Sequence, residues 1–373
     1  MTIGILKEKK TEKRVALLPE VVAELIKGGH EVLVETGAGD AAWAFDADYQ
    51  KVGAKSTPRS QTLEAPLLIG INAPENDEMS KLKEGQIFAG AINPLGEHAL
   101  IKAAGDAKLS VFSLDIIPRT TRAQAMDVLS SMATVSGYKA VLSAATLLPR
   151  FFPMFMSAAG TIKPAKMLIL GAGVAGLQAI ATARKLGAVV EVFDVRSAVK
   201  EEVKSLGGKF IEVEGAREDA AAGGYAVEQT DDFKEKQRLL IHERASAADI
   251  IIGTAQIPGR KAPVLITRET VAAMRPGSLI IDLAASSGGN CELTRNGESY
   301  VSNGVTILGK SDFPSEMPTD ASRMYGRNML NFLKLMLQKD GTLKLDFNDD
   351  LIKGTCVTHN GEVVSERVKQ FMV

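Results

Sequence analysis

The sequence predicts an α/β protein made of two doubly wound, Rossmann-like domains with a cleft between them, the first completed by the C-terminal segment. Apolar runs of strand length alternate with helical segments, which is typical of a mostly parallel sheet covered by helices. A glycine-rich turn joins one such strand to a helix in the middle of the chain. The 373 residues suffice for two cores. We expect one domain at 1–130 plus 321–373, and the other at 131–320.

The rest of the chain is organised around the stretch 166–196. An apolar run at 167–170 predicts a buried strand, and Gly171, Gly173 and Gly176 follow it in G-x-G-x-x-G spacing. In a dinucleotide site the first glycine permits the tight turn, the second lets the backbone approach a pyrophosphate, and the third lets the helix pack close to the sheet. Such spacing alone is weak, because glycine-rich turns are common.

What strengthens the motif is the order of elements after it. A helix is expected at 175–186 and a second strand at 189–193, with Asp194 at its end. Together they indicate a dinucleotide site, whose helix N-terminus offers free N–H groups to the phosphates. The alternative is a doubly wound domain that binds no nucleotide. Asp194 would accept hydrogen bonds from the adenosine ribose hydroxyls and would repel the 2′-phosphate of NADP, which favours NAD as the cofactor. The neighbouring Arg196 leaves NADP as an alternative cofactor.

The remaining segments continue the alternation. Before residue 120 we expect strands at 3–6, 31–35, 67–71, 86–92 and 111–114 and a helix at 19–27. After Asp194 we expect helices at 198–206, 233–245, 267–274 and 322–338, strands at 209–214, 250–253, 278–283 and 305–309, and a short hairpin around 360–361.

Polar residues gather in the segment before the nucleotide motif. Arg119, Gln124, Asp127 and Ser130 are expected on a loop and the first turn of a long helix. The last three share one face at i, i+3, i+6 spacing. They either line the cleft between the domains or form a solvated polar face.

The apolar segment at 140–162 has the length of a membrane span, but Arg150 near its middle argues against one. We expect a helix ending near Pro149 followed by a buried connector. The loop at 215–232 is long enough for a lid, or is a passive surface excursion.

Composition excludes several classes of function. The net charge of −1 gives no sign of nucleic acid or an anionic membrane as partner. Cys291 and Cys356 match no metal spacing, none of the four histidines lies in a candidate site, and we expect no metal. The first ten residues lack the apolar core of a signal peptide.

Several stretches together resemble one family, the NAD(H)-binding component (alpha subunit, domain I) of proton-translocating nicotinamide nucleotide transhydrogenase. They are RTTRAQAMDVLSSMATVSGYKA, AAGTIKPAKMLILGAGVAGLQAIATARKLGA, GGYA, TAQIPGRKAPVLIT and IDLAASSGGNC. They cover most of the chain in the family's order. Alanine dehydrogenase shares this fold and is the main competitor.

Three positions separate the two activities. Where alanine dehydrogenases carry a lysine, a histidine and an aspartate, this chain has Asn72, Asn93 and Ser286. Reducing an imine or a carbonyl needs an acid–base group, whereas hydride transfer between two nicotinamides needs positioning and exclusion of water. An acid–base-poor cleft therefore favours the transhydrogenase.

The resemblance also implies site residues. Gln124, Arg119 and Asp127 are expected to serve catalysis by positioning the nicotinamide. The cofactor-binding set implied is Arg119, Gln124, Ala125, Met126, Asp127, Ser130, Gly171, Gly173, Val174, Ala175, Gly176, Asp194, Val195, Arg196, Gly224, Tyr225, Gln237, Thr254, Ala255 and Gln256. Tyr225 and Gly224 would belong to a mobile loop. At Gln256 relatives often have leucine, which puts that contact in doubt.

The implied activity is that of a Re/Si-specific, proton-translocating NAD(P) transhydrogenase. NAD(H) would bind to this chain and NADP(H) to a partner component. The chain would be a homodimer, peripheral to the inner membrane on its cytoplasmic or matrix-type face through a membrane-spanning subunit. The alternatives are an autonomous amino-acid dehydrogenase, active without a partner, and a non-catalytic NAD(H)-sensing module, which would bind NADH without any transfer.

Overall fold

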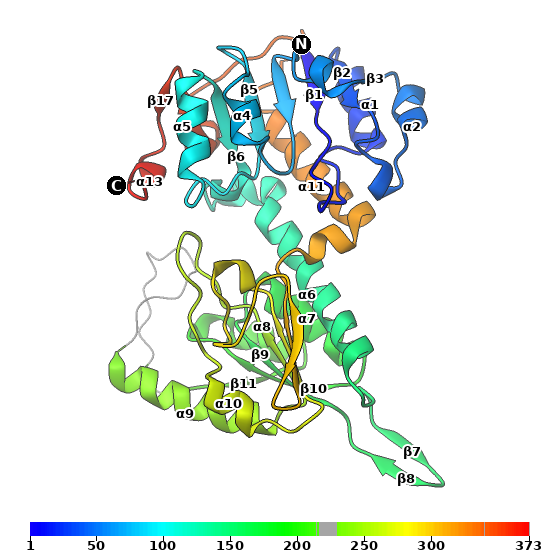
Figure 1. The fold of residues 1–373 in the computed structure, drawn as a ribbon, viewed down its shortest axis with the longest axis vertical. Helices are drawn as coiled ribbons and strands as arrows, with labels where there is room; N and C mark the ends of the chain where they lie inside the picture. The colour runs from blue at the N-terminus through cyan, green and yellow to red at the C-terminus, as the bar shows by residue number, and fades with distance from the viewer. Residues whose placement is uncertain (214, 216–229, 339, 373) are drawn as a thin grey trace. The chain divides into compact units, whose positions relative to one another are not determined.

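The computed structural model describes residues 1–213, 215, 230–338 and 340–372. It divides into two compact units, each with its own sheet flanked by helices (Figure 1). Unit 1 comprises Met1–Met132 and Pro314–Val373, and unit 2 comprises Ala133–Phe313. The α/β class with Rossmann-like parallel sheets is therefore confirmed.

Unit 1 holds an eight-stranded sheet in the order β17-β16-β6-β5-β4-β1-β2-β3. The first six strands in the chain pair in parallel, and β16 and β17 extend the sheet in antiparallel fashion. The strands are β1 (Thr2–Ile5), β2 (Glu31–Glu35), β3 (Lys55–Thr57), β4 (Leu67–Ile69), β5 (Ile87–Gly90), β6 (Ser110–Ser113), β16 (Cys356–His359) and β17 (Glu362–Val363). The helices and 3-10 turns are α1 (Pro19–Lys27), η1 (Asp40–Ala42), α2 (Asp46–Lys51), α3 (Arg59–Thr62), α4 (Asn76–Met79), α5 (His98–Asp106), η2 (Leu114–Ile116), η3 (Thr121–Met126), α11 (Pro318–Leu333), α12 (Asp350–Thr355) and α13 (Glu366–Lys369).

The late helix α11 belongs to the core of unit 1. Tyr325, Met329 and Phe332 are at most 1% exposed, and they pack in one cluster with residues of β1 and β2. Helix α1 joins the same cluster, with Pro19 in its first turn, where a fixed φ and a missing N–H cost nothing. Unit 1 is therefore assembled from the two ends of the chain.

Unit 2 holds a seven-stranded sheet in the order β11-β10-β9-β12-β13-β15-β14, antiparallel only at β14. Its strands are β9 (Lys166–Leu170), β10 (Val189–Phe193), β11 (Lys209–Ile211), β12 (Ile250–Gly253), β13 (Leu279–Asp282), β14 (Ser299–Ser302) and β15 (Val305–Gly309). The helices and 3-10 turns are α7 (Val174–Lys185), η4 (Ser197–Val199), α8 (Lys200–Ser205), α9 (Asp231–Ala247), α10 (Arg268–Ala273) and η6 (Ala285–Ser287). Helix α6 (Val128–Leu147) and the turn η7 (Phe313–Glu316) include the two boundaries between the units.

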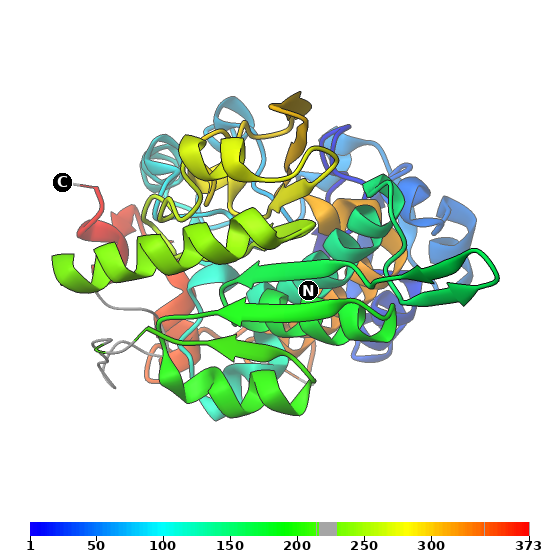
Figure 2. The ribbon, with the colours of Figure 1, turned by 90° about the horizontal axis from the view of Figure 1, so that it is seen from below.

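Both faces of this sheet are covered, as Figure 2 shows. Along β9, Met167 and Ile169 pack into one cluster together with α7, while Leu168 and Leu170 pack into another with α9 and α10. A strand that is buried on both faces is uniformly apolar rather than alternating, which explains the continuous run at 167–170.

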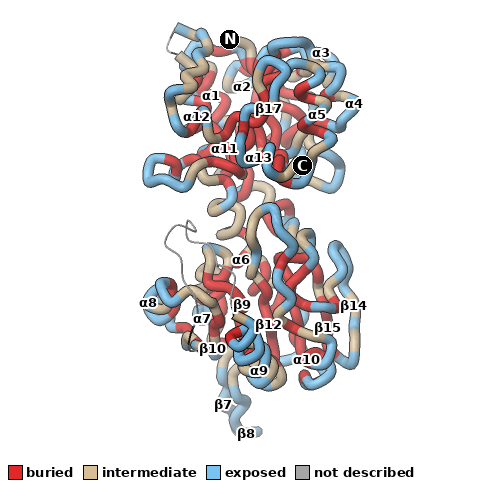
Figure 3. The backbone as a smooth tube through the Cα atoms, turned by 90° about the vertical axis from the view of Figure 1, so that its left-hand side faces the viewer, coloured by how far each residue is buried: buried red, intermediate tan, exposed pale blue. Residues whose placement is uncertain are grey.

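The segment after α6 corrects one expectation. It is not a buried connector but an antiparallel hairpin of β7 (Phe155–Ser157) and β8 (Gly160–Ile162), exposed throughout (Figure 3). Met156 is 74% exposed, and the rings of Phe151 and Phe155 contact each other at a tilt of 46°, with centroids 4.3 Å apart. Hydropathy indicated burial, but all three side chains are exposed. Within the described residues no helix is long and apolar enough to cross a membrane.

Candidate functional site

The glycine turn after β9 has the geometry that its spacing predicts. The N–H of Gly171 bonds to the carbonyl of Phe193 at 2.8 Å, and Gly171 adopts a φ of +100°, which favours glycine. A Cβ added at Gly176 would lie 2.0 Å from the carbonyl oxygen of Gly171, so no side chain fits there. These two glycines are required by the protein's own packing.

Gly173 differs from the other two. A Cβ at this position would meet no atom of the described residues within 4 Å, so their packing does not require a glycine. Gly173 is also the N-cap of α7, and its extended backbone offers no side-chain cap to the helix. The first N–H groups of α7 therefore lack a capping side chain, beside an open position of the backbone. This arrangement fits a pyrophosphate, which such N–H groups bind.

Asp194 follows β10 directly and contacts this turn. Its Oδ2 accepts the main-chain N–H of Ala172 at 2.7 Å, and its Oδ1 accepts that of Arg196 at 2.9 Å. The Arg196 guanidinium donates to both oxygens, from Nε at 2.9 Å and from Nη2 at 2.6 Å. These hydrogen bonds raise the pKa of Arg196 above its ordinary value. The structure thus brings the glycine turn and the acid together.

The end of β12 lies beside the same turn. The hydroxyl of Thr254 donates to the carbonyls of Leu170 and Gly171, at 3.1 and 3.0 Å. Ala255 is held by Asn290, whose Oδ1 accepts its N–H at 2.9 Å and whose Nδ2 donates to its carbonyl at 2.8 Å. Asn290 is 2% exposed, and sequence reasoning did not assign it a role. Its signal was the G-G-N-C stretch after a strand.

Two further residues support the turn. Asp282, at the end of β13, accepts the main-chain N–H groups of Asn290 and Cys291 at 2.6 and 3.0 Å. Gly137 on α6 lies against the start of α7, where a Cβ would meet the carbonyl of Ala175 at 2.1 Å. A glycine inside a helical pattern was the sequence signal for this close approach.

The polar segment of unit 1 corrects a second expectation. Gln124 lies on η3, and Asp127 has an extended backbone, so the helix is interrupted between them. Asp127 is the N-cap of α6: its Oδ1 accepts the N–H of Ser130 at 2.9 Å, and its Oδ2 accepts the Ser130 hydroxyl at 2.5 Å. The i, i+3, i+6 face therefore does not form. Asp127 and Ser130 bond to each other, while Gln124 is exposed.

Helix α11 holds η3 in place. The carbonyl of Ala125 accepts the side-chain amides of Asn328 and Asn331, at 2.9 and 3.0 Å. Neither asparagine was assigned a role from the sequence, since their contact joins positions about 200 residues apart. Arg119 is exposed and Met126 buried.

The positions of the remaining predicted cofactor-binding residues say little about the site. Gln237 lies in α9 and is partly buried. Gln256 and Val174 are exposed, while Val195 and Ala175 are partly buried. Gly224 and Tyr225 lie outside the described residues. Among those that are described, no group of three or more His, Cys, Asp or Glu side chains could hold a metal ion.

The three positions that separate the two activities have acidic neighbours in two cases. Asn72 donates from Nδ2 to Glu8 at 2.9 Å, and the N–H of Asn93 bonds to Asp115 at 2.8 Å. Burial raises the pKa of Glu8 and of Asp115 above the ordinary value. Ser286 donates its N–H to the Ser311 hydroxyl. Unit 1 is therefore less poor in acid–base groups than its sequence indicated.

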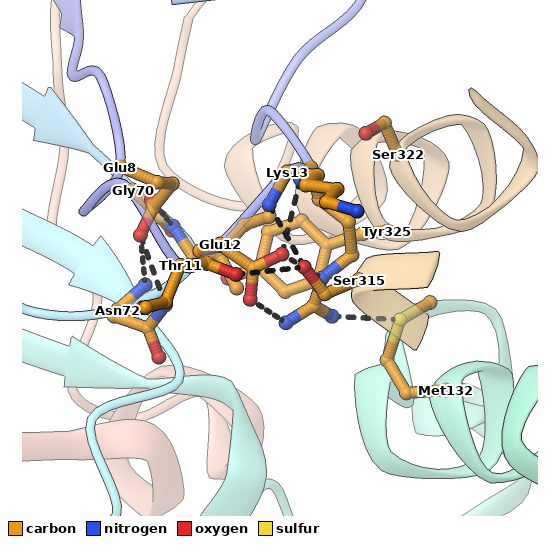
Figure 4. Close-up of polar contacts among 12 residues, drawn as sticks. Glu8, Thr11, Glu12, Lys13, Gly70, Asn72, Met132, Ser315, Ser322 and Tyr325 are labelled. Atoms are coloured by element: carbon orange, nitrogen blue, oxygen red, sulfur yellow. Dashed lines mark hydrogen bonds and ion pairs between the residues drawn. The ribbon is translucent and has the colours of Figure 1, made fainter. Parts of the chain in front are cut away.

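Figure 4 shows the surroundings of Glu8. Arg14 forms a two-pronged pair with Glu12, from Nε at 2.8 Å and from Nη2 at 2.6 Å, and its Nη1 contacts the sulfur of Met132 at 3.0 Å. Tyr325 donates its hydroxyl to the carbonyl of Gly70 at 2.9 Å. Arg14 and Glu12 are only 12% and 11% exposed, so each neutralises the other within the unit.

A doubly wound sheet with a glycine turn, an uncapped helix N-terminus and an acid after the second strand defines a Rossmann-type nucleotide-binding protein. The chain belongs to the alanine dehydrogenase/PNT family, whose N-terminal domain matches residues 4–136 and whose C-terminal domain matches residues 140–366.

Individual relatives agree with this assignment. An NAD(P) transhydrogenase alpha-subunit chain of Rhodospirillum rubrum is 44% identical over 375 residues, covering 98% of each chain. The crystal structure of transhydrogenase from Sinorhizobium meliloti matches with a TM-score of 0.86 at 38% identity, over 98% of this chain and 100% of that one. An L-alanine dehydrogenase structure matches with a TM-score of 0.83 at 25% identity, over 100% and 99% of the chains. This chain is a homologue of transhydrogenase alpha subunits, whose naming implies partner subunits.

Proposed function

We propose that this chain is the NAD(H)-binding component of a proton-translocating transhydrogenase. Its reaction is direct hydride transfer between NADH and NADP⁺ held by a partner component. The observation that carries the proposal is the open position at Gly173, at the uncapped N-terminus of α7. The full-length similarity to transhydrogenase alpha subunits supports it.

The residues of unit 2 fit the dinucleotide. The N–H groups at the start of α7 bind the pyrophosphate, and Asp194 accepts hydroxyls of the adenosine ribose. Thr254 and Ala255 form the neighbouring rim, held by Asn290.

For the nicotinamide, the support is family resemblance together with chemistry. When bound, it supplies the carbon from which hydride leaves. Gln124 can donate and accept hydrogen bonds without titrating, which suits the positioning of a carboxamide. Arg119, Asp127 and Ser130 are proposed to assist it, with Asp127 and Ser130 already fixed by their mutual hydrogen bonds.

The proposed partners rest on the family resemblance, and the subunit naming of the relatives supports the existence of partner subunits. This chain forms a homodimer, and it works with an NADP(H)-binding component and a membrane-spanning subunit that carries the protons. It is thereby peripheral to the inner membrane, on the cytoplasmic or matrix-type face. The exposed apolar side chains of the β7–β8 hairpin support a subunit contact, since such patches mark interaction surfaces.

One observation favours a second candidate, an autonomous amino-acid dehydrogenase. Glu8 and Asp115, with raised pKa values, lie beside the positions where that enzyme needs a proton donor. A cavity of about 220 Å³ at the ends of β1, β2 and β4 is lined by Glu8 and Asn72 among other polar residues. Either carboxyl could serve as the acid in such a reaction.

The experiment mixes the purified full chain with a transhydrogenase NADP(H)-binding component and follows oxidation of NADH by an NADP⁺ analogue. A parallel arm supplies pyruvate and ammonia without the partner. Transfer only with the partner supports the proposal. NADH oxidation in the pyruvate arm alone, abolished by Glu8→Gln or Asp115→Asn, supports the dehydrogenase. NADH binding without transfer in either arm would leave a sensing module.

A further inference from the structure

The hydrogen-bond acceptor positions of the Asp194 carboxylate are all occupied by donors of the described residues. An ionised carboxylate offers about four lone-pair positions. Four donors occupy them here: the N–H groups of Ala172 and Arg196, and the Nε and Nη2 of the Arg196 guanidinium. The Asp194 side chain is 6% exposed and that of Arg196 is 26% exposed. Arg196 thus lies over the acid that is expected to receive a ribose.

The four donors are not equally removable. The N–H of Ala172 is fixed by the turn after β9, and the N–H of Arg196 by the chain leaving β10. Only the guanidinium, at the end of a flexible side chain, can withdraw without a change in the backbone. A ribose diol that donates to Asp194 therefore takes the positions of Nε and Nη2.

We propose that the Arg196 guanidinium competes with the adenosine ribose for the Asp194 carboxylate, and that the Asp194–Arg196 pair, rather than Asp194 alone, sets discrimination between NAD(H) and NADP(H). The inference rests on the proposed function, since it places the nucleotide on unit 2. The guanidinium competes with the ribose hydroxyls of NAD(H). Once displaced, it is an ideal partner for a 2′-phosphate, which a guanidinium binds through two parallel hydrogen bonds.

The pair therefore limits selectivity from both sides. Arg196 weakens the binding of NAD(H) because it competes with the ribose for Asp194. It also weakens the exclusion of NADP(H) because it neutralises the charge of Asp194. Removing Arg196 exposes an uncompensated carboxylate, which favours ribose hydroxyls and repels a phosphate. Removing the charge of Asp194 weakens its bonds to the guanidinium and removes the repulsion of a phosphate, with the opposite result.

The test measures Kd values for NADH and NADPH by nucleotide fluorescence, on the full chain and on Arg196→Met, Asp194→Asn and the double variant. In Arg196→Met we expect NADH to bind about three- to tenfold more tightly and the NADPH/NADH ratio of Kd values to rise by about tenfold or more. In Asp194→Asn the ratio should fall below that of the unmodified chain. In the double variant the NADPH/NADH ratio of Kd values should not fall in this way, because no guanidinium remains to bind the phosphate.

The chain offers a matched control at the other end of the same sheet. Asp249 is 5% exposed, accepts the N–H of Lys166 at 2.9 Å and pairs with Arg150, as Asp194 pairs with Arg196, and it also pairs with Arg275 at 3.2 Å. Arg150→Met should leave both Kd values within about twofold. Melting temperatures of all variants establish that each is folded.

Two outcomes would overturn the inference. Weaker NADH binding by Arg196→Met would show that Arg196 contacts the bound nucleotide rather than competing with it. An unchanged ratio would show that Asp194 discriminates alone. Both leave the proposed function intact, whereas failure of the unmodified chain to bind either nucleotide would overturn the proposed function and the inference together.

Discussion

The two sheets share a topology and differ in the turn that follows their first strand. In unit 1, β1 lies between β2 and β4, and in unit 2, β9 lies between β10 and β12. After β9 the chain passes through the glycine turn straight into α7. After β1 the chain continues instead into a charged segment that includes Arg14 and Glu8, and Glu8 lines a cavity there. Topology thus creates a crevice in each unit, and the turn decides what can enter it.

The acids at the ends of the second strands sharpen this comparison. Glu35, the last residue of β2, accepts the N–H of Lys7 at 2.8 Å and the Nη1 of Arg59 at 2.7 Å. Asp194 accepts an N–H two residues past β9 and an arginine in the same manner. An acid after the second strand is therefore not a nucleotide signal by itself. The open glycine beside it makes the difference.

The largest effect is expected within the glycine turn. Gly176→Ala places a Cβ against the carbonyl of Gly171 and should destabilise the chain by about 3 kcal/mol or more, with loss of NADH binding. The Cβ of Gly173→Ala meets no atom of the residues that the structure describes, so stability should stay within about 0.5 kcal/mol while NADH affinity falls by about tenfold or more. Urea denaturation and fluorescence titration separate the two. Normal NADH affinity in Gly173→Ala would contradict the pyrophosphate assignment.

Unit 1 should respond to its ion pair instead. Glu12→Gln leaves Arg14 buried without its partner and should destabilise the chain by about 3 kcal/mol near pH 7. Burial alone would raise the pKa of Glu12, but the hydrogen bonds from Arg14 outweigh it and hold the pKa below its ordinary value. The folded chain therefore binds this proton less tightly than the unfolded chain. The stabilisation by the Glu12–Arg14 pair is therefore fully present at pH values above the ordinary pKa of a glutamate. It is lost as the pH falls through the lower pKa that Glu12 has in the folded chain.

Stability curves from pH 7 to pH 3 test this sign. The difference in free energy of unfolding between Glu12→Gln and the unmodified chain should become smaller as the pH falls. Glu31→Gln removes an exposed pair with Lys55 and serves as the control, with an effect below about 1 kcal/mol. A gap that widens in acid would contradict the role of the Glu12–Arg14 pair.

A smaller effect is expected from Asn290. Its replacement by alanine leaves the main-chain groups of Ala255 without their partner and should cost about 1–3 kcal/mol. NADH affinity should fall with it, because the end of β12 is no longer fixed beside the glycine turn. Asn296→Ala, at an exposed position, is the control. Unchanged NADH affinity in Asn290→Ala would contradict the assignment of Ala255 to the nucleotide site.

Gln124→Asn should leave stability unchanged and act on the rate alone. The backbone of η3 stays held by Asn328 and Asn331, while the amide is withdrawn by one methylene. Hydride transfer in the presence of the partner component should slow by about tenfold or more, with NADH affinity nearly retained. Stopped-flow transfer and fluorescence titration measure the two quantities, and Gln50→Asn provides an exposed control. An unchanged rate would exclude Gln124 from nicotinamide positioning.

Local patterns predicted much of this fold. The bounds of α1, β2, β10, β12 and β15 follow from apolar runs, Pro19 and glycine stops, and Thr267 caps α10 as expected. The sequence did not predict β3, β14, α2 or α5, which are short or weakly patterned. It also misplaced the exposed β7–β8 hairpin, because hydropathy does not distinguish a core from a surface patch.

The site shows the same division. The glycine spacing and Asp194 could be recognised locally, since each element is adjacent in the chain. Asn290 and Asn328 could not, because each bonds to a backbone group distant in sequence. The occupation of Asp194 by Arg196 depends on side-chain conformation, which spacing does not specify.

The return of the chain to unit 1 has a consequence for biosynthesis. Leu17 and Val21 leave the ribosome before unit 2, but Phe332 and Ile352, which complete their core, are made only after all of unit 2. Unit 2 is contiguous and can fold as soon as it is released. The apolar surface of unit 1 must wait, at roughly 5–20 residues per second, for its last helices. The need for chaperones during synthesis should therefore fall on Met1–Met132, the part of unit 1 that is made before unit 2.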